Sequence, residues 1–183
     1  MPSSHWTIRI AASCLGAVLT TSLLTAASAS AATDDSSEGW TRFETADSTF
    51  PAGKHCDFAL FSDVVRDNEF FKNVSFYPDG SPRTQLFKGP LVIRYTNLET
   101  GASVVRDLTG NSAVEYAVDG SFRSITIQNG SFSGGMPDGG SHPRGRYIVT
   151  GRWSSLTVNG DGTNTIALGP KGTAENICDT LAG

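Results

Sequence analysis

The sequence predicts an all-β protein, folded as a single antiparallel up-and-down β-barrel of about eight strands. From residue 50 onward, short runs rich in β-branched and aromatic side chains alternate with Gly, Asp, Asn and Pro, a pattern typical of strands and turns. No segment carries a sustained apolar stripe at helical spacing, and only short helical turns are expected, at 63–71 and 174–181. A closed barrel would remove exposed strand edges. A β-sandwich and a β-trefoil remain the alternatives.

Residues 1–31 have the features of a secretory signal peptide. Arg9 gives a weakly basic start, an apolar run follows over 10–24, and Ala29-Ser30-Ala31 matches the small-x-small pattern at a cleavage site. The apolar run is shorter than the roughly 20 residues of a membrane span. We therefore expect a secreted, extracellular protein that is not held at a membrane after cleavage. Its mature part is a flexible polar lead-in at 32–49 and one β-barrel domain at 50–183.

The three cysteines predict one disulfide bond. Cys14 lies in the signal peptide and is removed with it. Cys56 and Cys178 remain, and an oxidising compartment favours a bond between them. This bond would join the start of the domain to its end; two separate buried thiols are the alternative.

Three strand pairs can be placed from turn residues. An Asp-Gly turn between alternating apolar positions is among the strongest local hairpin signals. The expected pairs are 92–96 with 102–105 before and after Gly101, 113–118 with 122–127 around Asp119-Gly120, and 147–153 with 163–168 joined through 160–162.

A weak repeat runs through the domain, because Asp-Gly followed by Ser or Thr recurs at Asp79, Asp119 and Asp161. A threefold repeat of this length would suit a β-trefoil and carbohydrate binding. The alternative is good turn chemistry used three times, since the segments between share little.

Several stretches resemble a family of small secreted actinobacterial all-β proteins of uncharacterised function. They are Cys56-Asp57-Phe58, 76–80, the Gly-Pro…Thr-Asn-Leu-x-Thr-Gly stretch at 89–101, Asp119-Gly120-Ser121 and Ile177-Cys178-Asp179. The resemblance implies a secreted all-β domain with cysteines at its two ends. The layout is also similar to the barrel of allene oxide cyclases and dirigent proteins. No catalytic motif of those families is matched, so this likeness implies a fold alone.

The charge pattern argues against several classes of partner. The net charge is −4 and the charged residues are scattered singly, which does not suit nucleic acid or an anionic membrane. No cofactor and no metal are expected, because His55 and His142 are the only histidines beyond the leader and no His-x-x-x-His or Cys-x-x-Cys occurs. The sequence does not identify a partner; a small apolar ligand is the candidate.

Two groups of residues are candidates for ligand binding. Tyr95, Tyr116 and Trp153 alternate along expected strands and could line an apolar cavity, although core packing explains them equally well. The Gly-rich stretch 134–146, the longest expected loop, carries Asp138, His142 and Arg144 as a polar rim.

No catalytic residue is assigned. Asp138, Ser141 and His142 name an acid, a nucleophile and a base, but a short Gly-rich loop does not build the oriented chain that nucleophilic catalysis needs. Asp57, Glu115 and Asp119 could supply a carboxylate pair for glycoside chemistry only if two lay close together.

Three functions therefore stay open. The first is a non-enzymatic module that binds a small ligand or a partner. The second is a cyclase- or isomerase-like enzyme with a polar site inside the barrel. The third is an extracellular structural or interaction protein. An enzyme would be favoured if two or more of Asp57, Arg94, Glu115 and Arg152 pointed inward, since inward charges are costly without a task.

Overall fold

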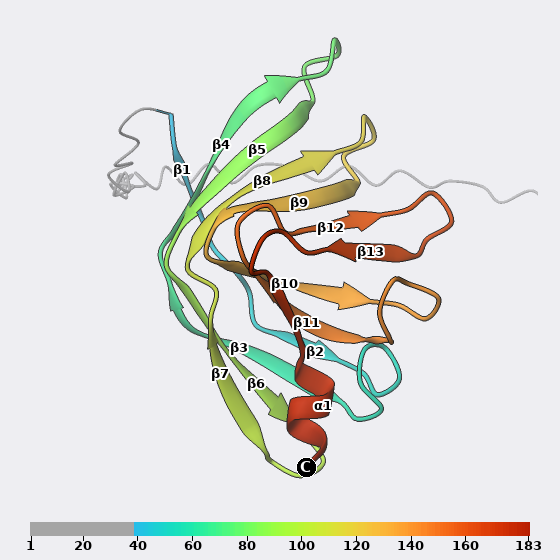
Figure 1. Ribbon diagram of the computed structural model, residues 1–183. Coiled ribbons are helices and arrows are strands. Elements are labelled where there is room, and N and C mark those ends of the chain that lie inside the picture. Colours follow the sequence, from blue (N-terminus) through green and yellow to red (C-terminus); the bar gives the residue numbers. More distant parts are fainter. Residues whose placement is uncertain (1–38) are drawn as a thin grey trace, which may run out of the picture. The chain divides into compact units, whose positions relative to one another are not determined.

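The computed structural model describes residues 39–183, and their regular secondary structure consists of β-strands and one short helix (Figure 1). The expectation of an all-β protein with antiparallel strands is confirmed, since every paired strand runs antiparallel to its neighbour. The signal peptide expected at 1–31 lies outside the described residues. The elements are β1 (Thr41–Phe43), β2 (Ser48–Phe50), β3 (Leu60–Asp67), β4 (Glu69–Phe76), β5 (Pro82–Gly89), β6 (Leu91–Asn97), β7 (Ser103–Asp107), β8 (Gly110–Tyr116), β9 (Phe122–Asn129), β10 (Ser131–Met136), β11 (Gly145–Thr150), β12 (Ser155–Val158), β13 (Asn164–Ala167), β14 (Thr173–Asn176) and α1 (Ile177–Ala182).

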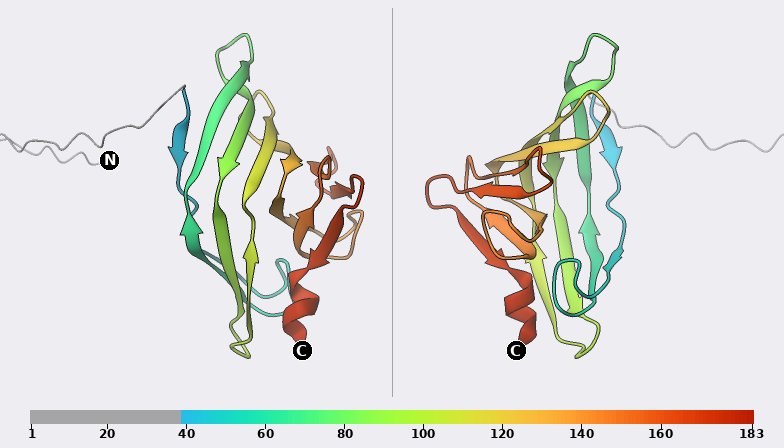
Figure 2. Two further views of the ribbon diagram at one scale, coloured as in Figure 1. Left: turned by 60° about the vertical axis from the view of Figure 1, so that its left-hand side comes forward. Right: turned by 90° about the vertical axis from the view of Figure 1, so that its right-hand side faces the viewer.

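The expected number of about eight strands is too low because four long strands bend and continue in a second sheet (Figure 2). The bends fall at Asn68, Pro90, 108–109 and Gly130, between β3 and β4, β5 and β6, β7 and β8, and β9 and β10. The Asn68 amide donates to the Pro90 carbonyl at 2.8 Å, so neighbouring bends lie side by side. A Cβ built on Gly110 would come within 2.2 Å of a backbone oxygen, and such a close backbone approach requires glycine.

The strands of residues 39–183 pair into three sheets and not into one closed ring, so a single closed barrel is not confirmed. The sheet orders are β1-β4-β5-β8-β9-β12-β13, β2-β3-β6-β7 and β10-β11-β14. Between β13 and the β10–β11 hairpin there is one backbone hydrogen bond, from the Ser141 amide to the Asn164 carbonyl at 2.9 Å, and two side-chain hydrogen bonds in place of a ladder. Asn164 Nδ2 donates to the Gly135 carbonyl at 2.7 Å, and Ser141 Oγ accepts from the Ile166 amide at 2.8 Å. The seven-stranded sheet therefore ends at β13.

Strand β11 is buried on both faces and separates two core clusters. Ile148 packs with residues of the four-stranded sheet and α1, whereas Tyr147 and Val149 pack with residues of β9, β10, β12 and β13. Alternate side chains of one strand thus serve two cores, because successive residues of a strand point to opposite faces.

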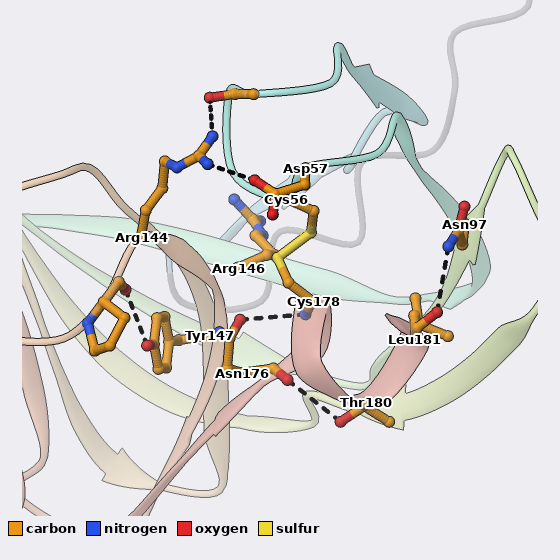
Figure 3. The surroundings of a disulfide bond; sticks show 12 residues. Cys56, Asp57, Asn97, Arg144, Arg146, Tyr147, Asn176, Cys178, Thr180 and Leu181 are labelled. Atoms are coloured by element: carbon orange, nitrogen blue, oxygen red, sulfur yellow. Dashed lines mark hydrogen bonds and ion pairs between the residues drawn. A yellow bond between two sulfur atoms is a disulfide. The ribbon is translucent and has the colours of Figure 1, made fainter. Parts of the chain in front are cut away.

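The predicted disulfide between Cys56 and Cys178 is present, with Cα atoms 5.2 Å apart (Figure 3). Cys178 lies in the first turn of α1, where its amide donates to Oδ1 of the N-cap residue Asn176 at 3.1 Å. At the other end of the helix, Asn97 Nδ2 donates to the Leu181 carbonyl at 3.2 Å. The helical turn expected at 174–181 is therefore found, although it begins at Ile177.

Two local expectations are wrong. Residues 63–71 form the end of β3 and the start of β4 in place of a helical turn, because the chain bends there between two sheets. The last expected pair, 147–153 with 163–168, omits β12, which pairs with β13 and β9. Strand β11 ends at Thr150, and Trp153 adopts a φ of 69° in the turn that follows.

The lead-in expected to be flexible at 32–49 contains β1 and most of β2. Arg42 pairs with Asp67 at 2.8 Å, and the ring of Phe43 meets the ring of Phe87 edge-on at 5.3 Å between centroids. These contacts hold the segment against β3, β4 and β5, so ordered strand begins before the expected domain boundary at residue 50.

The Asp-Gly repeat is one turn used at three hairpin tips of the seven-stranded sheet, between β4 and β5, β8 and β9, and β12 and β13. In each, the Asp carboxylate accepts from the amide two residues on, at 2.9 Å. Each tip also closes with the same two backbone hydrogen bonds. The repeat therefore reflects turn chemistry, the second of its two interpretations.

Candidate functional site

A cavity of about 260 Å³, partly open to solvent, is lined by residues from all three sheets. Nine of its sixteen lining residues are apolar or aromatic, and seven are polar or charged. The lining residues are Phe43, Thr45, Ala46, Ser48, Phe50, Ser62, Glu69, Leu91, Ile93, Tyr95, Leu108, Ile125, Ser131, Phe132, Ser133 and Arg146. Cavities of this composition are the usual place for a small ligand in a protein of unassigned function.

Glu69 is the acidic group of this cavity. It is the first residue of β4, directly after the bend at Asn68, and it is half-buried. Burial raises the pKa of its carboxyl. The hydrogen bond that the carboxyl accepts from Thr45 Oγ1 at 3.0 Å lowers the pKa, but by less. Arg42 is the cation that acts on it. For the enzyme alternative left open by the sequence, a pocket carboxyl with a raised pKa is the candidate for proton transfer.

Arg146 is the basic group of the same cavity and comes from β11. Its Nε donates to Ser133 Oγ at 2.8 Å, and its guanidinium carbon lies 5.1 Å from the centre of the Phe50 ring. Within residues 39–183 no carboxylate lies in ion-pairing distance of Arg146. The half-buried Arg106 and Arg144 both have such partners.

A second cavity, of about 330 Å³, shares Ile125, Phe132 and Ser133 with the first as a common wall. His55 lines it from the loop that precedes β3, and its ring meets Phe50 edge-on at 4.8 Å between centroids. The two cavities are therefore neighbours, with Phe132 and Ser133 between them.

His55 is an uncharged histidine in this wall. Its Nδ1 is buried and has no hydrogen-bond partner within the described part of the chain. Burial, followed by the charges of Arg146, Lys54 and Arg144, lowers the pKa of His55 to about 4. The ring is therefore neutral at physiological pH. Of the three cations that act on it, Arg144 pairs with Asp57 and Asp138, whereas Arg146 has no carboxylate partner within residues 39–183.

The charged residues whose direction was left open by the sequence do not point inward. Asp57, Arg94, Glu115 and Arg152 are all exposed. The charged residues that line the first cavity are Glu69 and Arg146. Arg146 belongs to the Gly-rich stretch 134–146, where it was expected in a polar rim, whereas no sequence pattern singled out Glu69.

The three aromatic candidates for ligand binding lie in different parts of the structure. Tyr95 is 1% exposed and lines the first cavity. Tyr116 is half-buried beside a separate shallow hollow with Pro82 and Gln85. Trp153 is 55% exposed at the surface, where Arg152 stacks on its ring. The three side chains thus do not form one site.

The polar rim residues lie on a loop that is shorter than expected. Residues 134–136 belong to β10 and 145–146 to β11, since glycines there allow His55 and Leu156 to pack close to the backbone. Arg144 pairs with Asp57 at 2.6 Å (Figure 3). It also pairs with Asp138 at 3.6 Å.

The acid, nucleophile and base of this loop do not form a catalytic chain. Ser141 Oγ lies 3.0 Å from His142 Nδ1 and also accepts from the Ile166 amide. Asp138 pairs with Arg144 and has no hydrogen bond to His142. The serine hydroxyl therefore serves to join the loop to β13.

Residues 39–183 contain no group of three or more His, Cys, Asp or Glu side chains that could hold a metal ion. No helix in that range is long and apolar enough to cross a membrane. Comparisons with protein-family models, with curated proteins and with solved structures gave no match.

Proposed function

We propose that the protein is a secreted, non-enzymatic module that binds a small, largely apolar ligand in the cavity between its three sheets. The single observation that carries this proposal is the cavity itself. Phe43, Ile93 and Phe132 bring apolar surface from all three sheets, and serine and threonine hydroxyls, Glu69 and Arg146 are placed among them. A site of this kind removes apolar surface from water while a few polar groups fix the orientation.

Export is part of the proposal. It rests on the leader at 1–31 and is supported by the Cys56–Cys178 disulfide, since such bonds persist in oxidising compartments. We also propose a barrel-like enclosure for the ligand, in which the side-chain bonds of Asn164 and Ser141 stand in for a backbone ladder. Intact mass of the secreted protein tests export: a species that begins near Ala32 is expected, and one that keeps Cys14 would contradict it.

Binding can be tested with 2-naphthamide, a neutral aromatic probe small enough for the cavity. Saturable binding to the disulfide-intact mature protein is expected by titration calorimetry. Ser48→Trp should abolish it, because Ser48 lines the cavity and an indole would fill the space. Thr49→Trp is the matched control: Thr49 is the next residue of β2 and is exposed. Equal binding by both variants would place the probe elsewhere and remove the support for this site.

A further inference from the structure

We propose that the ligand of the cavity is a carboxylic acid with an apolar body, and that Arg146 binds its carboxylate. This inference rests on the proposed function and names the chemical class of the ligand. Among the half-buried arginines of residues 39–183, Arg146 alone has no carboxylate partner.

Arg106 and Arg144 each pair with carboxylates of the chain. Arg106 makes a two-point contact with Glu175, and Arg144 bonds Asp57 and Asp138. Arg146 has comparable burial, yet within the described residues it bonds only Ser133 Oγ and stacks on Phe50. A guanidinium has five donors in a planar fork that fits a carboxylate at two points. The outer nitrogens of Arg146 are thus left for a group that the cavity admits.

Ser133 adds a second donor at the same place. Its Oγ accepts from Arg146 Nε, so its own O–H proton is left to donate, and no acceptor for it occurs among residues 39–183. A ligand carboxylate at Arg146 could therefore accept from both the guanidinium and the serine hydroxyl. Hydrogen bonds to a charged acceptor are about twice as strong as neutral ones.

The charges around Arg146 favour an anion. The electrostatic effects of Arg146, Lys54 and Arg144 act together on His55 in the same sense. Asp57 and Asp138 are engaged by Arg144. Glu69 is influenced by Arg42 and Asp67. The end of the cavity at Arg146 consequently has positive charge without a matching carboxylate.

A single negative charge fits better than two. Arg146 is the only cation that lines the cavity in the described residues, and an uncompensated second charge next to apolar walls would be costly. Phe43, Phe50, Phe132 and Tyr95 supply aromatic surface for the body of the ligand. A small aromatic monocarboxylate is therefore the class that we assign.

The test compares 2-naphthoate with 2-naphthamide, which differ in charge but hardly in shape. By titration calorimetry at pH 7.5, 2-naphthoate should bind the disulfide-intact mature protein about tenfold more tightly. Arg146→Met keeps the apolar stem and removes the charge, so it should lose this preference while 2-naphthamide binds as before. Arg94→Met is the control, because Arg94 is exposed on β6 and its loss changes the net charge equally.

The outcomes separate the two proposals. If 2-naphthamide and 2-naphthoate bind wild type equally, or if Arg94→Met and Arg146→Met lower 2-naphthoate affinity alike, the carboxylate inference is overturned while the binding function stands. If neither probe binds, both proposals fall. Should Arg146→Met not fold, the comparison of the two probes on wild type decides, together with octyl phosphate as a dianionic probe. Tighter binding of octyl phosphate than of 2-naphthoate would also overturn a monocarboxylate.

Discussion

The imidazole of His55 lies against the backbone of Gly135 so closely that a Cβ on that glycine would come 2.3 Å from Cε1 of the ring. This contact forms part of the wall of the second cavity. It also places a neutral, buried ring nitrogen next to β10.

Replacement of Gly135 by alanine should therefore be destabilising. The new methyl group would have to displace a ring already packed between Phe50 and β10, and overpacking of this kind costs about 1–3 kcal/mol of the free energy of unfolding. Gly160→Ala is the matched control, since a Cβ at Gly160 would have no atom within 4 Å and the φ of this glycine is not positive. Urea unfolding measures both; equal stability of the two variants would contradict the packing described.

Acid should weaken the fold partly through His55. Its pKa falls from an ordinary value of 6.5 to about 4 in the folded protein, because of burial and the nearby cations. Between these values the unfolded chain binds more protons, so the free energy of unfolding declines as pH falls from about 6.5 to about 4. The limit is about 3 kcal/mol, and we expect about 1–2 kcal/mol because the side chain is only partly buried and solvent screens its charge.

The variant His55→Leu isolates this effect, since Glu69 and the other acids titrate in both proteins. Urea unfolding at pH 7.5 and pH 4.5 should show that wild type loses more stability than the variant. Equal losses would show that His55 does not contribute to the acid sensitivity.

The disulfide should contribute strongly to stability. It joins two buried residues far apart in the chain, and removal of a native disulfide from a small secreted domain costs about 2–5 kcal/mol. Cys178→Ser should lower the free energy of unfolding by this amount, and Cys56→Ser with Cys178→Ser should lose little more, because the same bond is lost. Alkylation of both cysteines in wild type without reductant would refute the bond.

Amide hydrogen exchange should separate the loop at 137–144 from the strands beside it. Asp138 and Gly139 are exposed and should exchange fast, whereas Ile148 and Val149 are buried in β11 and should be strongly protected. Ser141 should be intermediate, because its amide donates to the Asn164 carbonyl at 2.9 Å. Protection of Asp138 equal to that of Val149 would mean that the loop is far more rigid than its exposure indicates.

The sequence predicts best what is local. The hairpins at Gly101 and at Asp119-Gly120 are predicted correctly because a two- or three-residue signal determines each turn. The disulfide follows from the number of thiols left after the leader. Neither depends on how distant strands are arranged.

The candidate site is harder to predict because strand alternation is interrupted at its key residues. Glu69 directly follows the bend at Asn68. The alternation of inward and outward side chains along β3 therefore does not predict the face on which Glu69 lies. Arg146 lies in β11, which is buried on both sides, so alternation cannot separate an inner from an outer face. A run such as Tyr147-Ile148-Val149 signals a doubly buried strand, and that signal could have directed attention to its neighbour Arg146.

The bends at Asn68, Pro90 and Gly130 have a consequence for ligand choice. Each long strand contributes to two sheets, so the sheets are joined covalently at the bends, and the bends at Asn68 and Pro90 are also joined by a backbone hydrogen bond. For the ligand that we propose, the pocket should therefore be preorganised, with the same backbone when empty and when occupied. Affinity should then fall steeply once a ligand exceeds the volume of the pocket, instead of declining gradually as it would in an adaptable groove.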